Sequence, residues 1–392
     1  MNKFILHKEV QAYISSHLQA DVHQLAMAKS PFEDLSSREL AVQISSKKKA
    51  EKKLPTWFAA AQIYYPEPLS IEQTSSETTA AYKAGLIDGG TLIDLTGGFG
   101  VDSYYFSKKA EKVVHCEINA ELSEITAHNL KTLGADHIQC IAGDGLAYLK
   151  AYPGHFNTIY IDPARRSQSG KVFMLKDCTP NVIENMDLLL SKSDQIIIKT
   201  SPLLDITAGI KELQFVTEVH IVSTRNECKE LLFILKRHQN TPVKIISSTI
   251  NESLKQFSAE LYQEAEVTFT EGKLKEYIYE PDAALLKSGA FSLIGKTYGL
   301  EKLQEQTQLY TSDQFKKEFP GRIFKITETL TAADLKKEKE LRGNIIVRNY
   351  PDKAENLSKK YKIKPADDQF LIFTKSRSSG LLIIKAQILQ YY

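Results

Sequence analysis

The chain has 392 residues, of which 42% are hydrophobic and 25% charged, with 50 basic and 48 acidic side chains. This balance is typical of a globular protein of two or three domains and excludes a disordered, collagen-like or coiled-coil chain. Its longest apolar runs, such as Leu231–Leu235, are far below the roughly 18 to 20 residues of a membrane span, and no signal-peptide core is found. We therefore expect a cytoplasmic protein without a membrane partner.

The N-terminal region, residues 1–75, is predicted to be helical. Apolar residues at four-residue spacing form one face of a helix: Val10, Ile14 and Leu18. A lysine-rich run over 47–53 ends at Pro55, which stops a helix. Such a run is usually a solvated helix end, and contact with phosphate is the alternative.

Residues 76–240 alternate short apolar strands with helices. Thr74 and Glu77 have the spacing of a capping box and so start the first of these helices. Five strands are predicted at Thr91–Leu95, Lys112–Cys116, His137–Ala142, Thr158–Asp162 and Gln195–Lys199. Two more, near Phe215–Ser223 and Leu231–Arg237, are close enough to form an antiparallel edge pair. This alternation predicts an α/β domain with a Rossmann-like, doubly wound, mostly parallel seven-stranded sheet.

Residues 241–392 have a different pattern and are predicted to form a separate α+β domain. Strand-like runs at 322–326, 344–347 and 370–374 alternate there with helical segments at 333–339 and 354–361.

The stretch from Leu92 to Asp102 is a buried strand that leads through a glycine turn into a helix. A ligand can approach the backbone closely at such a turn. A dinucleotide site is one candidate, but it needs a third glycine, and Ser103 stands in that position. Asp94, just before the turn, would repel a pyrophosphate and attract an ammonium group. S-adenosylmethionine (SAM) carries an ammonium and a sulfonium and no phosphate, so this pattern favours SAM.

Two further acidic residues follow the next two strands. Glu117 lies nineteen positions after Gly98, where a carboxylate can accept both hydroxyls of a ribose. Asp144 follows the third strand, where it can accept from the amino group of adenine. The alternative for each acid is a helix cap or a solvated strand end. Three acids at three successive strand ends favour a SAM site.

These residues resemble the first three motifs of the class I SAM-dependent methyltransferases, over roughly residues 70–240. The resemblance implies that the cofactor lies across the strand ends, with Gln73 and Ser76 covering its methionine end. The implied cofactor-binding residues are Gln73, Ser76, Asp94, Thr96, Gly97, Gly98, Phe99, Gly100, Glu117, Ile118, Asp144 and Gly145.

Five shorter motifs resemble a bacterial family of methyltransferases with a THUMP-like domain at the C-terminus. They are Leu54-Pro55-Thr56-Trp57, residues 72–77, Asp162-Pro163-Ala164-Arg165-Arg166, Tyr279-Glu280-Pro281-Asp282 and Arg348-Asn349-Tyr350-Pro351. Because THUMP modules are associated with RNA modification, the resemblance implies a transfer or ribosomal RNA substrate that the C-terminal domain helps to bind.

The motif at residues 162–166 ends the fourth strand, where open α/β sheets bind their ligands. Asp162 can accept a hydrogen bond from an attacking amine, and Pro163 stiffens the loop. Arg165 and Arg166 match the geometry of a phosphate. We take these four residues as candidate catalytic residues, the alternative being a turn whose arginines form structural ion pairs.

Two known chemistries fit this motif incompletely. Enzymes that methylate base amino groups usually carry an aromatic residue here that stacks on a flipped base, and this loop has none. Methylation of uridine at C5 needs a thiolate, and Thr200 stands where its cysteine is expected. Among the nine histidines and four cysteines no ligand cluster is found, so no metal is expected.

The sequence therefore predicts a SAM-dependent methyltransferase acting on RNA. A methyltransferase for proteins or small molecules, and a SAM-binding protein without catalysis, are the alternatives.

Overall fold

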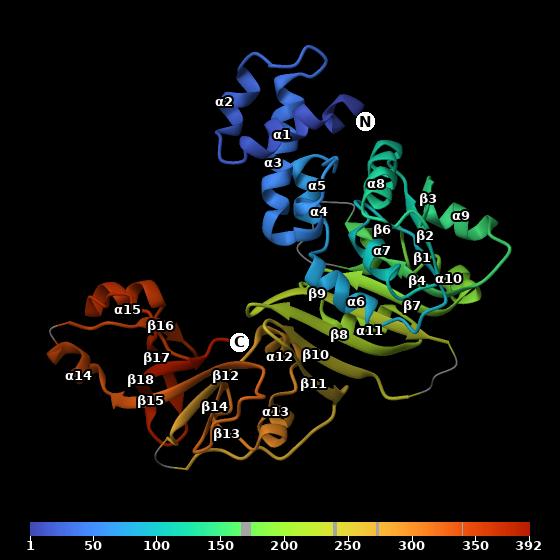
Figure 1. Cartoon of the computed structure of the whole chain (residues 1–392). Coiled ribbons are helices and arrows are strands. Elements are labelled where there is room, and N and C mark those ends of the chain that lie inside the picture. The colour runs from blue at the N-terminus through green and yellow to red at the C-terminus, as the bar shows by residue number, and fades with distance from the viewer. Residues whose placement is uncertain (166–173, 238–240, 272–273, 339) are drawn as a thin grey trace. The chain divides into compact units, whose positions relative to one another are not determined.

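The computed structural model describes residues 1–165, 174–237, 241–271, 274–338 and 340–392. The chain divides into two compact units (Figure 1). The first comprises Met1–Val216 with Phe233–Gln239, and the second comprises Thr217–Leu232 with Asn240–Tyr392. The domain borders that we place at residues 75 and 240 stay predictions.

The first unit begins with short helices, as predicted for the N-terminal region. They are η1 (Lys3–Leu6), α1 (Lys8–Ser16), α2 (Val22–Met27), α3 (Ser37–Lys53), α4 (Pro55–Ala59) and α5 (Pro68–Gln73). A capping box of Ser36 and Glu39 starts α3, and Pro55 stops it and becomes the first residue of α4.

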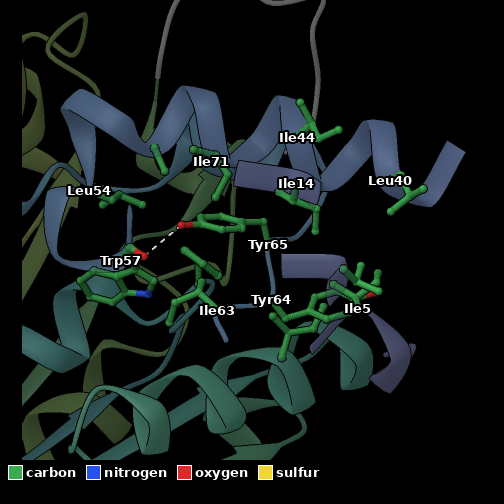
Figure 2. Close-up of a cluster of buried hydrophobic side chains, with 14 of the residues drawn as sticks. Ile5, Ile14, Leu40, Ile44, Leu54, Trp57, Ile63, Tyr64, Tyr65 and Ile71 are labelled. Atoms are coloured by element: carbon green, nitrogen blue, oxygen red, sulfur yellow. Dashed lines mark hydrogen bonds between the residues drawn. The ribbon is translucent and has the colours of Figure 1, made fainter. Parts of the chain in front are cut away.

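One apolar core joins these helices to the glycine turn (Figure 2). Trp57 and Ile71 are fully buried in it, and the hydroxyl of Tyr65 donates to the carbonyl of Trp57 at 3.0 Å. The Trp57 ring also packs 6.2 Å from the ring of Phe99, centroid to centroid. Phe99 belongs to the glycine turn, so the N-terminal helices support that turn directly.

The rest of the first unit alternates strands and helices. These elements are α6 (Glu77–Ala84), β1 (Thr91–Asp94), α7 (Val101–Phe106), β2 (Lys112–Glu117), α8 (Ala120–Thr132), β3 (Gln139–Ala142), α9 (Gly145–Ala151), β4 (Phe156–Ile161), β5 (Ala164–Arg165), η2 (Leu175–Asp177), β6 (Cys178–Thr179), α10 (Met186–Lys192), β7 (Ser193–Thr200) and α11 (Ile206–Glu212). The prediction of the five main strands is confirmed. They are parallel neighbours in the order β7-β4-β1-β2-β3, so their carboxyl ends lie at one edge of the sheet.

The large sheet has more strands than the predicted seven. Its later strands in the chain are β8 (Val216–Thr224), β9 (Glu227–Lys236), β10 (Lys244–Ile250) and β11 (Leu254–Glu260). β10 pairs with β8 in parallel and β11 pairs with β10 antiparallel, so the sheet has nine strands among the described residues. The two predicted strands are neighbours, but the prediction that they form the edge of the sheet is wrong, because β10 and β11 lie beyond β8.

A second sheet of seven strands fills the remainder of this unit, in the order β13-β14-β12-β15-β18-β17-β16 over the part of the chain that is described. Its strands are β12 (Tyr277–Pro281), β13 (Glu301–Gln304), β14 (Thr307–Ser312), β15 (Gly321–Leu330), β16 (Asn344–Val347), β17 (Gln369–Ser376) and β18 (Gly380–Gln390). The helices are α12 (Ala283–Ser288), α13 (Phe291–Tyr298), α14 (Ala332–Lys337) and α15 (Ala354–Tyr361). None of the described helices is both long and apolar enough to span a bilayer.

Candidate functional site

The glycine turn between β1 and α7 depends on close packing at two of its glycines. A Cβ at Gly97 would come within 2.0 Å of the His115 ring, and one at Gly100 within 2.6 Å of the Thr126 methyl group. Gly98 shares a left-handed φ with Gly100, 56° against 80°, but differs from both glycines in its surroundings. The only described atom within 4 Å of its Cβ position is a carbonyl oxygen 3.9 Å away. Its outer face is therefore open to a ligand.

Asp94 ends β1 and is buried beneath this turn, with 1% of its surface exposed. Its Oδ1 accepts from the Thr96 amide at 3.1 Å, and its Oδ2 accepts from the Ser103 hydroxyl at 2.7 Å. Burial raises the pKa of Asp94 to about 7, and the nearby charges of Asp102 and Asp162 add to this shift. The carboxyl group thus ties the turn to the first turn of α7.

His115 lies behind the same hydroxyl and is fully buried in β2. Its Nδ1 is 3.0 Å from the Ser103 Oγ, which donates its own proton to Asp94. With the Ser103 proton directed at Asp94, it is Nδ1 that carries the proton of the neutral ring and donates to the Ser103 oxygen. Burial lowers the pKa of His115 to about 4, so the ring stays neutral and fills the space that Gly97 leaves.

Glu117 ends β2 and holds the turn from the other side. Its Oε2 accepts from the Gly98 amide at 2.9 Å, and its Oε1 accepts from the Asn119 amide at 2.7 Å. Since each carboxylate oxygen can accept more than one hydrogen bond, the half-buried Glu117 retains capacity for hydroxyl donors. The neighbouring Ile118 side chain is 74% exposed, so it presents an apolar surface at this edge.

Asp144 caps the N-terminus of α9 through one oxygen only. Oδ1 accepts from the amides of Leu146 and Ala147, at 2.8 and 3.2 Å, which leaves Oδ2 open to a donor from outside. The next residue, Gly145, is buried, and a Cβ there would come within 2.5 Å of the Leu95 carbonyl oxygen. Both the cap and an outward-facing acceptor are therefore present at Asp144.

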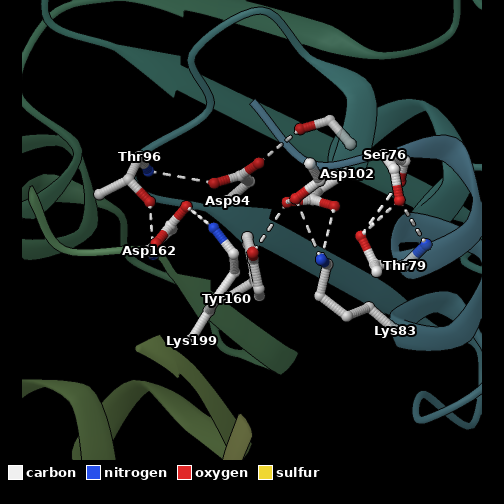
Figure 3. A network of polar contacts seen from close by, with 11 residues as sticks. Ser76, Thr79, Lys83, Asp94, Thr96, Asp102, Tyr160, Asp162 and Lys199 are labelled. Carbon is white, nitrogen blue, oxygen red and sulfur yellow. Dashed lines mark hydrogen bonds and ion pairs between the residues drawn. The ribbon is translucent and has the colours of Figure 1, made fainter. Parts of the chain in front are cut away.

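Asp162 directly follows β4 and contacts both the glycine turn and β7 (Figure 3). Its amide donates to the Thr96 hydroxyl at 2.7 Å, and its carboxylate forms an ion pair with Lys199 near the end of β7. About a third of its side-chain surface remains exposed. The pairing fixes a carboxylate and an ammonium together at the carboxyl edge of the sheet.

The rest of the motif at 162–166 is described in part. Pro163 is buried. Ala164 and Arg165 form β5, whose backbone pairs with Thr179 and Cys178 of β6. Arg166 lies outside the described residues.

A buried network behind Asp94 has no local signature in the sequence (Figure 3). The Lys83 ammonium of α6 lies 3.1 Å from the Asp102 Oδ1, while Ser75 and Tyr160 each donate to the Oδ2 of Asp102 at 2.8 Å. Burial alone would raise the pKa of Asp102, but the charges of Lys83 and Lys199 and these hydrogen bonds hold it below its ordinary value. No local motif marks Lys83, because its partner is nineteen residues away.

The start of α6 is capped by a different residue from the one that the sequence predicts. Ser76, not Thr74, caps α6 by accepting from the Thr79 amide at 3.1 Å, so the predicted capping box is wrong. Glu77 instead accepts from the amide and hydroxyl of Thr56, both at 2.6 Å, and from Tyr105. This carboxylate therefore joins α4 to α7, while Gln73 ends α5 with an exposed side chain.

Three of the described thiols are poor nucleophiles. Burial raises the pKa of Cys116 to about 12 and that of Cys140 and Cys228 to about 11. Thr200, which stands where methylation of uridine at C5 would need a cysteine, is buried at the end of β7. Within the described ranges, no group of three or more His, Cys, Asp or Glu side chains could hold a metal ion.

Two motifs of the second unit meet through a buried carboxylate. The Glu280 side chain is 2% exposed; its Oε2 accepts from Arg322 Nε at 2.6 Å, and its Oε1 forms an ion pair with Arg348 Nη2 at 2.6 Å. Asp282, two residues after Glu280, is also buried. It caps α12 and accepts from the Ser223 hydroxyl at 2.5 Å. The motifs at 279–282 and 348–351 thus belong to one structural cluster.

Comparison with protein families identifies two domains at the C-terminus. Residues 277–320 match a ferredoxin-like domain, and residues 321–386 match a THUMP domain-like family. The border between them falls between Glu280 and its partners Arg322 and Arg348, so this ion-pair cluster joins the two matched segments.

Known proteins resemble the chain over most of its length. Proteins from two strains of Mycobacterium tuberculosis, both named as uncharacterized SAM-dependent methyltransferases, are 21% identical over 325 residues, covering 81% of this chain and 87% of theirs. A crystal structure of a candidate methyltransferase from Porphyromonas gingivalis is 28% identical, with a TM-score of 0.86 and 99% of each chain covered. The chain is thus a relative of the SAM-dependent methyltransferases, with a THUMP-like domain at its C-terminus.

Proposed function

We propose that this protein is a SAM-dependent methyltransferase that acts on RNA. The observation that carries the proposal is the glycine turn, which is held by Asp94 on one side and Glu117 on the other. The open face of Gly98 lies between these two acids in the sequence, at the carboxyl edge where parallel sheets bind ligands.

The residues around this turn fit the parts of SAM. Glu117 retains acceptor capacity for the ribose hydroxyls, and Oδ2 of Asp144 can accept from the adenine amino group. The exposed Ile118 gives the adenine ring an apolar neighbour. Gln73 and Ser76 lie two residues before and one residue after the buried Ser75, whose hydroxyl donates to Asp102, and this supports their proposed contact with the methionine end.

The charges of the site also fit. Asp94, Asp102 and Asp162 provide three carboxylates, and Lys83 and Lys199 provide two ammonium groups. When all five are ionised, this group carries one net negative charge, and the carboxylates of Glu117 and Asp144 make the site more negative still. SAM carries one net positive charge, whereas the product that has lost its methyl group carries none. The site therefore favours the methyl donor over the spent cofactor.

Bound SAM supplies a methyl group on a sulfonium, which is transferred by direct displacement. The chain's contribution is then mainly alignment of donor and acceptor. Asp162 is the proposed acceptor-orienting residue, because its carboxylate is fixed by Lys199 and still exposed. An amine of the substrate can donate to it, which directs the nitrogen lone pair toward the methyl group.

RNA is supported by the match of residues 321–386 to THUMP-like domains and by the basic motif at Arg165 and Arg166. Transfer and ribosomal RNA are the two substrate classes that we propose. The raised pKa values of Cys116, Cys140 and Cys228 favour an amino group over uridine C5 as the acceptor.

The shared premise, SAM binding, is tested by calorimetry or by fluorescence of the single tryptophan, Trp57. We expect binding in the micromolar range, and no binding at high micromolar concentration would overturn the proposal. Trp57 packs on Phe99 of the turn, so its fluorescence is suited to report ligand at the turn.

The acceptor is tested with labelled SAM and total bacterial RNA. Label that stays acid-precipitable after protease treatment and disappears with ribonuclease supports an RNA substrate. Label that is found only in protein or small solutes supports the corresponding alternative enzyme, and binding without any transfer supports a SAM-binding protein without catalysis.

A further inference from the structure

The C-terminal part of α3 concentrates lysines that differ in their contacts. Lys47 is buried and donates to the Ser15 hydroxyl at 2.9 Å. Lys49 pairs with Glu72, and Lys53 donates to the backbone carbonyl of Glu72 at 2.6 Å. These three lysines have structural partners within the N-terminal helices.

Lys48 and Lys52 have no such partner. Both side chains are exposed, and neither makes an ion pair or side-chain hydrogen bond among the described residues. They are four positions apart in α3, so they lie next to each other on one face, which we call the α3 lysine face. The nearby Glu51 makes no ion pair with either lysine in the described structure.

The two lysines repel each other, since neither ammonium has an ion-pair partner among the described residues. Like charges at four-residue spacing destabilise a helix. Attraction to the negative end of the helix favours basic residues in the last turn, which accounts for Lys52 and Lys53. Lys48 lies a full turn earlier, where this effect has faded. A ligand with closely spaced negative charges would remove the repulsion.

The end of α3 that carries the α3 lysine face is also linked by contacts to the segment that leads into the proposed catalytic site. Lys49 and Lys53 fix the end of α5 at Glu72, and Ser75, three residues later, donates to Asp102. Three residues span at most about 11 Å. The end of α3 is therefore within reach of a polymer that extends from the site.

We propose that Lys48 and Lys52 bind the phosphodiester backbone of the RNA substrate. The proposal rests on the proposed function and adds to it a surface in the N-terminal helices, outside the THUMP-like domain. Lysine acts on phosphate as a point charge without base contacts. The contribution to binding should therefore be independent of sequence and sensitive to salt.

The test compares the full-length protein with a Lys48→Gln/Lys52→Gln variant, using filter binding of labelled total bacterial transfer RNA and ribosomal RNA between 50 and 300 mM salt. Loss of two phosphate contacts should lower the slope of log affinity against log salt by about 1.4 to 1.8. The KM for RNA in the transfer assay should rise in parallel, with kcat and the affinity for SAM unchanged.

Lys131→Gln/Lys150→Gln provides the matched control. These lysines are also exposed and lie in the last turns of α8 and α9, at the opposite ends of helices that start from the proposed site. We expect wild-type RNA affinity and salt slope for this control. Equal losses in both variants would show a general charge effect and overturn the proposal.

The outcomes separate this inference from the function on which it rests. If the wild-type protein methylates RNA and the Lys48→Gln/Lys52→Gln variant keeps its salt slope and KM, the inference is wrong and the function stands. If the wild-type protein transfers no methyl group to RNA, the function fails first and the inference fails with it.

Discussion

The Lys83 ammonium lies 3.1 Å from Oδ1 of Asp102, and Lys83 is fully buried while Asp102 is 10% exposed. Removing one partner of such a pair leaves an uncompensated buried charge, which costs about 3 to 5 kcal/mol. We therefore expect Lys83→Met to lower the free energy of unfolding by that amount, as measured by urea denaturation.

The control for this prediction is the double variant Lys83→Met/Asp102→Asn. It removes both charges, so it should lose less stability than Lys83→Met alone. A loss below about 1 kcal/mol for the single variant would show that Asp102 is already neutral or hydrated, contrary to the lowered pKa that the network gives it.

Asp94 should make stability depend on pH in a recognisable direction. Burial raises its pKa to about 7 from an ordinary value of 3.8, so the folded chain holds a proton that the unfolded chain releases between these values. Its contribution to stability is full below pH 3.8 and is lost as the pH rises through 7. Relative to Asp94→Asn, the ligand-free wild-type protein should lose about 2 to 3 kcal/mol between pH 5 and pH 8.

Urea denaturation of both proteins at pH 5, 6.5 and 8 checks this difference. The buried His115, with a pKa lowered to about 4, gives the opposite slope between pH 4 and 6.5, but it is present in both proteins and cancels. A stability difference that does not change with pH would contradict the buried, proton-binding state of Asp94.

Gly98 and Gly134 allow backbone strain to be separated from ligand binding. Both have left-handed φ angles, 56° and 74°, and neither has another atom within 3.5 Å of its Cβ position. Alanine at either position should cost about 1 to 2 kcal/mol of stability. Only Gly98→Ala should also weaken SAM binding, by more than about tenfold, or 1.4 kcal/mol.

Calorimetric titration of both alanine variants with SAM provides the measurement. Equal affinities would place the cofactor away from the glycine turn. A parallel fall in both variants would point to global destabilisation instead.

Substitutions of Asp162 and Asp144 should affect different constants: Asp162 should affect kcat, and Asp144 should affect the affinity for SAM. Asp162→Ala removes the proposed acceptor-orienting group and should lower kcat by at least about 100-fold, with SAM affinity nearly unchanged. Asp144→Asn keeps a good helix cap but replaces an acceptor oxygen by an amide nitrogen, so it should weaken SAM binding and spare kcat at saturation. Unchanged turnover in Asp162→Ala would contradict its assigned role.

The strands of the first unit were predictable because each is a short apolar run followed by polar or glycine residues. β1 and β4, for example, end within one residue of their predicted ends. β10 to β14 and β18 were not predicted. Several of these strands pair antiparallel with one exposed face, as in β11, which gives weaker apolar runs.

The residues of the glycine turn could also be predicted, because Gly97, Gly98 and Gly100 meet conformational demands that few other residues satisfy. Lys83 could not be predicted. A buried lysine is indistinguishable in sequence from an exposed one until its partner is known.

The sequence alone determined the α/β class, the glycine turn and the order of its acids, since these follow from local periodicity and from backbone conformations that only glycine adopts readily. Tertiary structure alone decided which side chains pair: Asp162 with Lys199, Lys83 with Asp102, and Glu280 with Arg348. Such pairs join residues nineteen to sixty-eight positions apart in the sequence, and Coulomb attraction acts over distance in space and not along the chain.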